Sequence, residues 1–139
     1  MEIPGFGKLP SGLTNSNLDI FEQAFLPTRN LTFITLGSAY AYSLGADAVA
    51  IGLLAGPIFP DQTKEFIKKA QDSISESLGK TMKILTPFID LDKRDILRLA
   101  EEQKIPQITY YCHSGTEIPC GKCVSCRERK AAESDLSKT

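Results

Sequence analysis

The 139-residue sequence contains no tryptophan and a single histidine, His113. No apolar run reaches the roughly 20 residues that a membrane-spanning helix needs, and the N-terminus lacks the basic and then apolar order of a signal peptide. The formal net charge of -1 gives no general attraction to nucleic acid or to a membrane. We therefore expect a cytoplasmic protein without membrane association, of the length of one domain.

All four cysteines lie close together near the C-terminus, with the spacing C-x7-C-x2-C-x2-C: Cys112, Cys120, Cys123 and Cys126. A Cys-x-x-Cys loop lets two thiolates point at one centre, and Gly121 permits the tight turn that this requires. Four thiolates form a closed tetrahedral shell with no open position for a substrate. The spacing therefore predicts a structural zinc site that holds the surrounding irregular segment in place.

Three other interpretations of the cysteines stay open. Two disulfides fit the count but not a reducing compartment. An iron–sulfur cluster also takes four thiolates, although no Cys-Pro pair follows here. His113 lies beside Cys112 and could compete as a ligand, but four thiolates already complete the shell.

The remainder of the chain alternates between helical and strand-like patterns. Residues 1–27 are rich in Gly, Pro, Ser and Asn and predict an irregular segment. Thr28 is a candidate cap for a helix that runs to Tyr42 and ends near Gly45. This helix is apolar almost all round, so we expect it to be buried. The apolar run 48–54 predicts a strand that is covered on both faces.

A second helix is expected to open at Pro60-Asp61 and to end at Gly79, and residues 82–85 predict a second strand. Asp92 is a candidate cap for a third helix. This alternation is typical of an α/β layered fold. The predicted organisation is an irregular segment 1–27, an α/β core 28–109, a zinc knuckle with a C-terminal helix 110–132 and a polar tail 133–139.

The cysteine segment, from Pro119 to Arg129, resembles the C-terminal zinc motif of the 7-cyano-7-deazaguanine synthases, a family of PP-loop ATP pyrophosphatases in queuosine biosynthesis. Other segments occur in the same order as in that family, and the resemblance covers roughly Gly12 to Ala132. These segments are Gly12-Leu13-Thr14-Asn15, Leu26-Pro27-Thr28-Arg29-Asn30, Gly45-Ala46-Asp47, Gly52, Pro60-Asp61, Glu65-Phe66, Thr86-Pro87 and Lys93.

The resemblance implies a partial doubly wound parallel sheet of the adenine nucleotide alpha hydrolase type, with a C-terminal zinc knuckle made of four cysteines. It also implies a ligase that activates a carboxylate as its adenylate and then transfers it to ammonia. The implied substrates are a deazapurine-like carboxylate and ammonia, with ATP and Mg²⁺, and the product feeds tRNA modification. Zinc would be structural, and we expect a homo-oligomer.

The resemblance also assigns individual residues. Arg29 and Asn30 would bind the nucleotide or substrate, Asp61 would contact the substrate, and Lys93 would be a catalytic, phosphate-facing lysine. Each has a plainer alternative. Arg29 could pair with a nearby acid, Asp61 could be only a helix cap, and Lys93 could be a solvated lysine.

Two departures from the family are apparent. The phosphate-binding loop Ser-Gly-Gly-x-Asp-Ser is absent, and Ser11-Gly12-Leu13 does not replace it. The substrate loop, here 54–59, is shorter than in the family and lacks its Asp-x-Ser-Gly-Tyr stretch, and Thr63 stands where the family has an arginine. We therefore expect the C-terminal part of such an enzyme, inactive alone. It could be a truncated piece that lacks its N-terminal half, one subunit of a split enzyme with an N-terminal partner chain, or a degenerate relative.

A different class of function is also open. The chain could be a non-catalytic zinc-knuckle module that binds tRNA or a protein partner through basic and aromatic side chains beside the cysteines. The segment has such side chains at Tyr110, Lys122 and Arg127, but the negative charges of Glu117 and Glu128 reduce its net positive charge.

Overall fold

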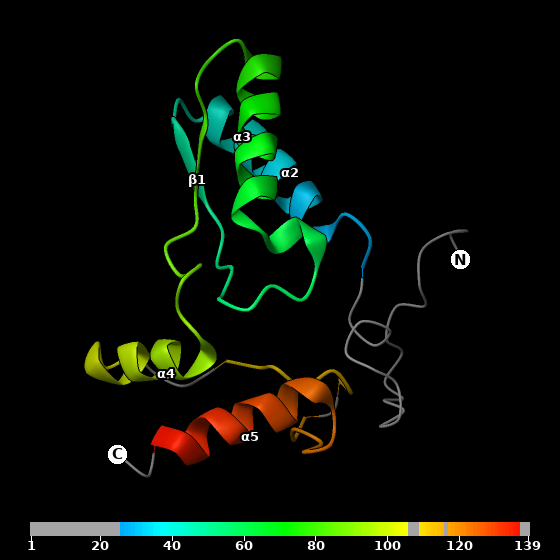
Figure 1. Ribbon diagram of the computed structural model, residues 1–139, viewed down its shortest axis with the longest axis vertical. Coiled ribbons are helices and arrows are strands. Elements are labelled where there is room, and N and C mark those ends of the chain that lie inside the picture. Colours follow the sequence, from blue (N-terminus) through cyan, green and yellow to red (C-terminus); the bar gives the residue numbers. More distant parts are fainter. Residues whose placement is uncertain (1–25, 106–108, 116, 137–139) are drawn as a thin grey trace. The chain divides into compact units, whose positions relative to one another are not determined.

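The computed structural model describes residues 26–105, 109–115 and 117–136 of the chain. The chain divides into two compact units (Figure 1). We call Thr28–Asp90 the sheet unit, and the described residues from Leu91 onward the cysteine unit. The sequence predicted one α/β core over residues 28–109, and the division after Asp90 falls within that range. The elements are α2 (Arg29–Ser43), β1 (Ala48–Ala50), the 3-10 helix η1 (Pro60–Gln62), α3 (Lys64–Leu78), β2 (Lys83–Leu85), α4 (Lys93–Glu102) and α5 (Val124–Leu136).

The sheet unit contains two parallel strands, with Ala48 opposite Lys83 and Ala50 opposite Leu85. The helices α2 and α3 both pack on the face that carries Val49 and the paired Ile84. The α/β alternation is therefore confirmed, but the doubly wound arrangement, with helices on both faces, is not seen within the described residues. The buried core of the unit consists of Ile34, Leu53, Ile67, Ala70, Ile74, Met82 and Ile84.

The first helix differs from its prediction in two respects. It is not buried all round, because Phe33 is 59% exposed, Leu36 65% and Tyr40 68%. Thr28 precedes the helix with a left-handed φ of 59° and makes no side-chain cap hydrogen bond. Apolar composition showed that this helix could be covered on all sides, but it could not show which segment of the chain covers each side.

The second helix starts later than predicted. Pro60-Asp61 belongs to η1, where the Gln62 side-chain oxygen accepts hydrogen bonds from the N–H groups of Ile58 (2.9 Å) and Phe59 (3.0 Å). The cap of α3 is Thr63, whose hydroxyl oxygen accepts from the Phe66 N–H at 3.2 Å. The predicted end at Gly79 is confirmed, with a left-handed φ of 62°.

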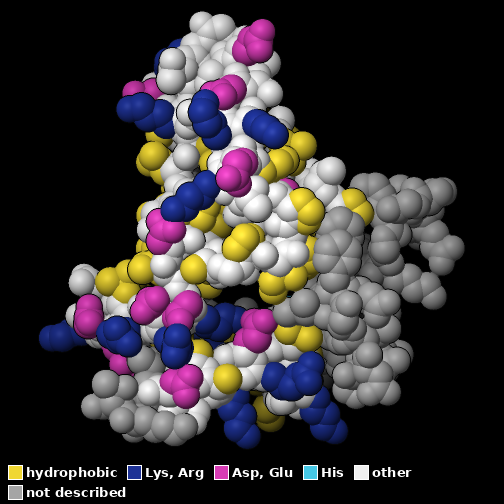
Figure 2. Space-filling model, viewed as in Figure 1, with side chains coloured by type: hydrophobic (Ala, Val, Ile, Leu, Met, Phe, Trp, Pro, Cys, Tyr) yellow, Lys and Arg dark blue, Asp and Glu magenta, His cyan; other side chains and the backbone are white. Residues whose placement is uncertain are grey.

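Charged side chains on the sheet unit are of mixed sign. Lys68 pairs with Asp72 one turn further along α3 (2.9 Å), and Lys64 pairs with Asp90 (2.6 Å). Figure 2 shows basic and acidic side chains interspersed on the visible face that carries α3. Such exposed pairs contribute little to stability but keep this helix face solvated.

In the cysteine unit, the predicted cap of α4 is confirmed. The Asp92 carboxylate accepts from the N–H groups of Arg94 (2.8 Å) and Asp95 (3.0 Å). The predicted tail 133–139 is wrong for its first residues, because α5 continues to Leu136. Glu133 pairs with Arg129 one turn earlier, which supports this extension.

Residues 137–139, 1–25 and 106–108 lie outside the described residues, as does the Gly12 segment of the family resemblance. Of the helices that the structure describes, none has the length and apolar character needed to cross a membrane.

Candidate metal centre

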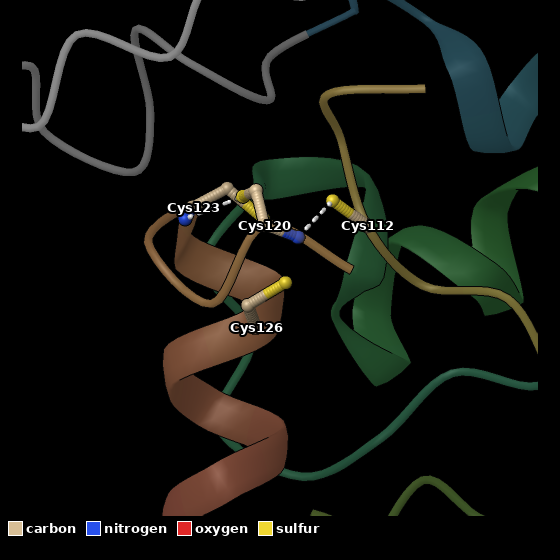
Figure 3. A group of neighbouring side chains, drawn as sticks. All are labelled: Cys112, Cys120, Cys123 and Cys126. Carbon is tan, nitrogen blue, oxygen red and sulfur yellow. Dashed lines mark hydrogen bonds between the residues drawn. The ribbon is translucent and has the colours of Figure 1, made fainter. Parts of the chain in front are cut away.

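The four cysteines converge on one point. Their sulfur atoms all lie within 4.8 Å of one another, and three of the four side chains are buried (Figure 3). Cys112 comes from an irregular segment, Cys120 and Cys123 from the loop before α5, and Cys126 from the first turn of α5. Tetrahedral zinc with Zn–S bonds of about 2.3 Å separates its sulfurs by about 3.8 Å, so only a small contraction would complete such a site.

Backbone N–H groups point at the sulfurs, as a loop that holds thiolates requires. Cys112 Sγ accepts from the N–H of Cys120 at 3.3 Å and of Ser114 at 3.4 Å. Cys120 Sγ accepts from the N–H of Cys123 at 3.4 Å and of Lys122 at 3.5 Å. Gly121 makes this turn with a φ of 70°, a conformation that favours glycine. The predicted turn at Gly121 is therefore confirmed.

These contacts change the pKa values of the thiols in opposite directions. The N–H of Cys120, followed by the contact with Ser114, lowers the pKa of Cys112 to about 5. The N–H groups of Lys122 and then Cys123 lower the pKa of Cys120. Burial, followed by the contact with Cys123, raises the pKa of Cys126 to about 12. The cluster therefore favours the thiolate form of Cys112 and Cys120. A thiolate at Cys126 would be stabilised by a bound cation.

The donor set fits a soft or borderline metal ion. All four cysteines are free thiols, so the structure contains no disulfide among them. The four sulfurs leave no position for a water or substrate, as expected for a structural site rather than a catalytic one. His113 does not belong to the converging group.

Sequence reasoning missed three contacts around the cysteines. His113 Nε2 shares a hydrogen bond with Ser125 Oγ at 2.8 Å, and the His113 N–H points at Cys123 Sγ at 3.5 Å. Arg129 lies over the Tyr111 ring, 5.4 Å from its centroid. No local sequence pattern indicates the contact between His113 and Ser125, because the two residues lie in different segments.

The predicted substrate residues of the sheet unit meet at the start of α2. The Asn30 N–H donates to Asp61 Oδ2 at 3.0 Å, and Asn30 Nδ2 donates to Asp61 Oδ1 at 2.9 Å. Asn30 is only 4% exposed. Asp61 therefore does cap a helix, but the helix is α2 and not the one that follows it in sequence. Arg29 is adjacent to this pair and half-buried.

Lys93 belongs to the cysteine unit. It is the first residue of α4, and its Nζ donates to Glu128 Oε2 on α5 at 2.8 Å. Lys93 therefore joins the two helices of this unit, and its side chain remains 38% exposed. Its predicted catalytic role stays a prediction.

Comparison with known proteins identifies the family. The sequence model of the family described as "Queuosine biosynthesis protein QueC" matches residues 8–136. A 7-cyano-7-deazaguanine synthase of Methanobrevibacter smithii is 32% identical, and the match covers 95% of this chain and 67% of that protein.

Two further relatives carry the same name. The one from Caldicellulosiruptor saccharolyticus is 35% identical over 86% of this chain and 59% of the relative. The one from Prochlorococcus marinus strain MIT 9515 is 37% identical over 83% of this chain and 55% of the relative. The chain thus spans between half and two thirds of the length of these curated relatives. The match over nearly the whole chain shows that it belongs to the QueC family of queuosine biosynthesis proteins.

Proposed function

We propose that this chain is the substrate-binding, zinc-stabilised C-terminal part of a ligase that converts a deazapurine carboxylate into a nitrile with ATP and ammonia. The observation that carries the proposal is the pairing of Asn30 with Asp61. Two family segments 31 positions apart in the sequence meet there, and both contribute polar groups to one end of α2.

The chemistry of this end of α2 suits an anionic substrate. The first N–H groups of a helix and its dipole attract negative charge. Arg29, at the first position of α2, offers a guanidinium that can bind a carboxylate or phosphate with two parallel hydrogen bonds. Both Asp61 oxygens are bound by Asn30, so Asp61 fixes the start of the helix, where Arg29 is the first residue.

ATP, when bound, would supply an adenylyl group for each of the two carboxylate oxygens. The first oxygen leaves with AMP when ammonia forms the amide, and the second leaves with AMP when the amide loses two protons to become the nitrile, so two ATP are used for each nitrile. The residues of this chain would bind the carboxylate, hold it for ammonia and stabilise the charge that develops. The four cysteines take no part in this chemistry, because their shell is closed. They would hold zinc and fix the fold of the cysteine unit.

The test is formation of AMP, pyrophosphate and nitrile from 7-carboxy-7-deazaguanine, ammonium and ATP. We expect no turnover by the chain alone. We expect turnover when the part of a family member's sequence that this chain does not span is supplied with it. In that complete system, Arg29→Gln should raise the KM for the carboxylate by about 10-fold or more, as expected for loss of a charged hydrogen bond. Robust product from the chain alone would contradict the proposal.

The alternative, a knuckle that binds tRNA, gains little from the structure. Arg129 is engaged with Tyr111 and with Glu133. Lys122 and Arg127 are exposed, but Glu128 directly follows Arg127 in the sequence and pairs with Lys93. Tight, salt-dependent binding of RNA to the chain would favour this alternative.

A further inference from the structure

The four cysteines of the metal centre come from two separate segments. Cys120 and Cys123 belong to the loop before α5 and Cys126 to its first turn, whereas Cys112 lies eight positions before Cys120 in an irregular segment (Figure 3). Bringing in a ligand from a separate segment costs more chain entropy than closing a Cys-x-x-Cys loop. The position of Cys112 therefore depends most on contacts that the metal itself does not make.

The residues on both sides of Cys112 contact α5. His113 Nε2 shares a hydrogen bond with Ser125 Oγ at 2.8 Å, and the Arg129 guanidinium lies 5.4 Å from the centroid of the Tyr111 ring. Ser125 and Arg129 are four positions apart on α5, so they lie on one face of the helix, about one turn apart. Cys112 is therefore held between two contacts with the same helix face. We call Tyr111, His113, Ser125 and Arg129 the Cys112 clamp.

The side chains of the clamp are themselves fixed. His113 Nδ1 is buried without a hydrogen-bond partner, so within the described part of the chain only Ser125 orients the ring by a hydrogen bond. The Arg129 side chain is only 15% exposed, and its Nε donates to Glu133 on the next turn of α5. A guanidinium that is largely removed from water interacts more strongly with an aromatic ring than an exposed one does. Both contacts therefore restrict the segment around Cys112.

The clamp places no ligand atom at the metal centre. Among the described residues, the ligand atoms that converge are the four cysteine sulfurs, and His113 lies outside this group. The clamp instead fixes how closely the two segments approach. At that approach the His113 N–H points at Cys123 Sγ at 3.5 Å, and the Cys120 N–H donates to Cys112 Sγ at 3.3 Å. Any influence of the clamp on a bound metal must therefore act through the position of Cys112.

We propose that Tyr111 and His113 are positioning residues of the metal centre. By holding both sides of Cys112 against one face of α5, they present the fourth sulfur to the other three and so raise the affinity for a divalent cation that prefers thiolates. Part of the entropy cost of ordering Cys112 is then met when the segment folds and not when the metal binds. Outer groups that orient ligands in this way typically contribute about 10- to 100-fold to metal affinity. The inference rests on the metal site of the proposed function and not on the ligase reaction.

The hydrogen bond of the clamp is tested by the zinc affinity of the full chain, measured by competition with a chromophoric chelator. His113→Ala and Ser125→Ala should each raise the Kd for zinc by about 10-fold or more. The double variant should be no weaker than either single one, because both changes remove the same hydrogen bond. His113→Gln, whose side-chain amide can still bond to Ser125, should stay within about 3-fold of the parent. At stoichiometric concentrations each variant should retain one equivalent of zinc.

The ring contact of the clamp has its own matched pair of variants. Tyr111→Leu removes the aromatic face beneath Arg129 and should raise the Kd for zinc by about 3-fold or more. Tyr111→Phe keeps that face and should change the Kd by less than about 2-fold.

A further experiment asks whether the clamp acts through Cys112. Once Cys112→Ser has removed the fourth sulfur, adding His113→Ala should change the metal affinity by less than about 2-fold. Cobalt(II) serves as a spectroscopic probe of the number of bound thiolates. The thiolate-to-cobalt charge-transfer absorbance per bound ion should fall by about a quarter in Cys112→Ser, because one of four Co–S bonds is lost. At saturation it should be unchanged in His113→Ala, which keeps all four sulfurs.

Three results would overturn the proposal. They are parental zinc affinity in His113→Ala, a His113→Gln variant as weak as His113→Ala, and equal losses from His113→Ala with and without the Cys112 sulfur. The last would mean that His113 stabilises α5 in general. A parent chain that binds no metal would reject both the metal site and the clamp. The expected pattern of zinc affinities without any ligase turnover in the complete system would reject the reaction and leave the clamp intact.

Discussion

The two units of this chain are stabilised by different means. The sheet unit buries an aliphatic core between its helices and strands, whereas four cysteines occupy the centre of the loop region in the cysteine unit. The buried residues of the cysteine unit are Leu97, Cys112, Cys123, Val124, Cys126 and Ala132. Apolar burial stabilises the first unit without a ligand. The second has few apolar residues to bury, so its stability should depend on an ion at the sulfurs.

The largest effect is expected from removal of the metal. Structural zinc contributes about 10 kcal/mol or more to the folding of small cysteine sites at neutral pH. Chelation, or Cys123→Ser, should therefore unfold the cysteine unit from residue 109 onward while the amides of α3 stay protected. Hydrogen exchange resolved by residue, together with elemental analysis for zinc and iron, measures both.

Ser125→Ala is the matched control for the cysteine substitution. It removes a hydroxyl close to the cluster, bonded to His113, but no ligand. It should retain one equivalent of metal. If the purified protein contains no metal, and strong chelation leaves its protected amides unchanged, the stability of the cysteine unit does not depend on a bound ion.

In the sheet unit, the largest effect should come from its core. Ile34 is 1% exposed on the buried side of α2, so Ile34→Ala should cost about 2–5 kcal/mol of unfolding free energy. Leu36→Ala, two residues away at a position that is 65% exposed, should stay within about 0.5 kcal/mol. Urea unfolding followed by circular dichroism compares the two. Equal costs of the two substitutions would mean that Leu36 is buried in the protein in solution.

A smaller effect is expected at the start of α2. Asp61→Ala leaves the buried amide of Asn30 without its acceptor and should cost about 1–3 kcal/mol. Asn30→Ala in the same background should then add little, because the two groups act as a pair. A double-mutant cycle by urea unfolding measures this coupling. Additive losses would show that Asp61 stabilises the chain through other contacts.

Some features could be predicted from the sequence because they depend on local chemistry. The Cys-x-x-Cys turn with its glycine, the Asp92 cap and the Gly79 end each follow from a few neighbouring residues, and the structure confirms them. The family segments could likewise be recognised in order along the chain, which the match over residues 8–136 confirms.

Other features depend on contacts between distant segments. The sequence could not show that Asp61 caps α2 across 31 residues, or that Lys93 pairs with Glu128 across 35. The predicted burial of α2 was wrong for the same reason. Hydrophobicity indicates that Phe33, Leu36 and Tyr40 need a partner surface, but it does not say which polypeptide supplies it.

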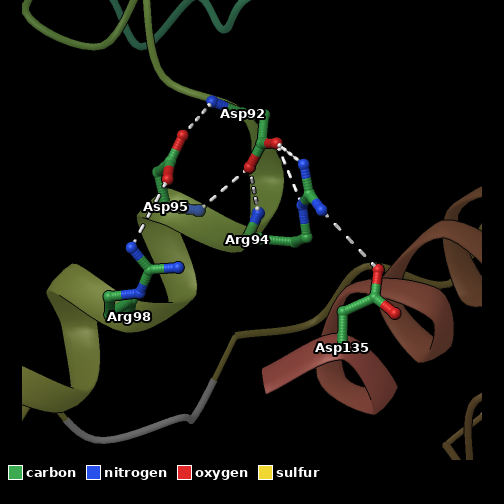
Figure 4. Close-up of polar contacts among 5 residues, drawn as sticks. All are labelled: Asp92, Arg94, Asp95, Arg98 and Asp135. Carbon is green, nitrogen blue, oxygen red and sulfur yellow. Dashed lines mark hydrogen bonds and ion pairs between the residues drawn. The ribbon is translucent and has the colours of Figure 1, made fainter. Parts of the chain in front are cut away.

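The smallest effect concerns the charge at the start of α4 (Figure 4). Asp92 caps the helix and also binds the Arg94 guanidinium, with Oδ2 to Nη2 at 2.6 Å. The hydrogen bond with Arg94, together with the N–H of Asp95, lowers the pKa of Asp92 to about 2. The unfolded chain has an aspartate pKa of about 3.9. The stabilisation is therefore complete above about pH 4 and is lost as the pH falls through about 2.

Asp92→Asn keeps an oxygen that can cap the helix but removes the charge that pairs with Arg94. At pH 7 the variant should unfold at a lower urea concentration than the parent, and the difference should shrink as the pH is lowered from 4 towards 2. Asp90→Asn removes an exposed partner of Lys64 in the sheet unit and should have little effect at any pH. A difference at pH 7 that persists unchanged at pH 2 would mean that Asp92 acts through the shape of its side chain and not through its charge.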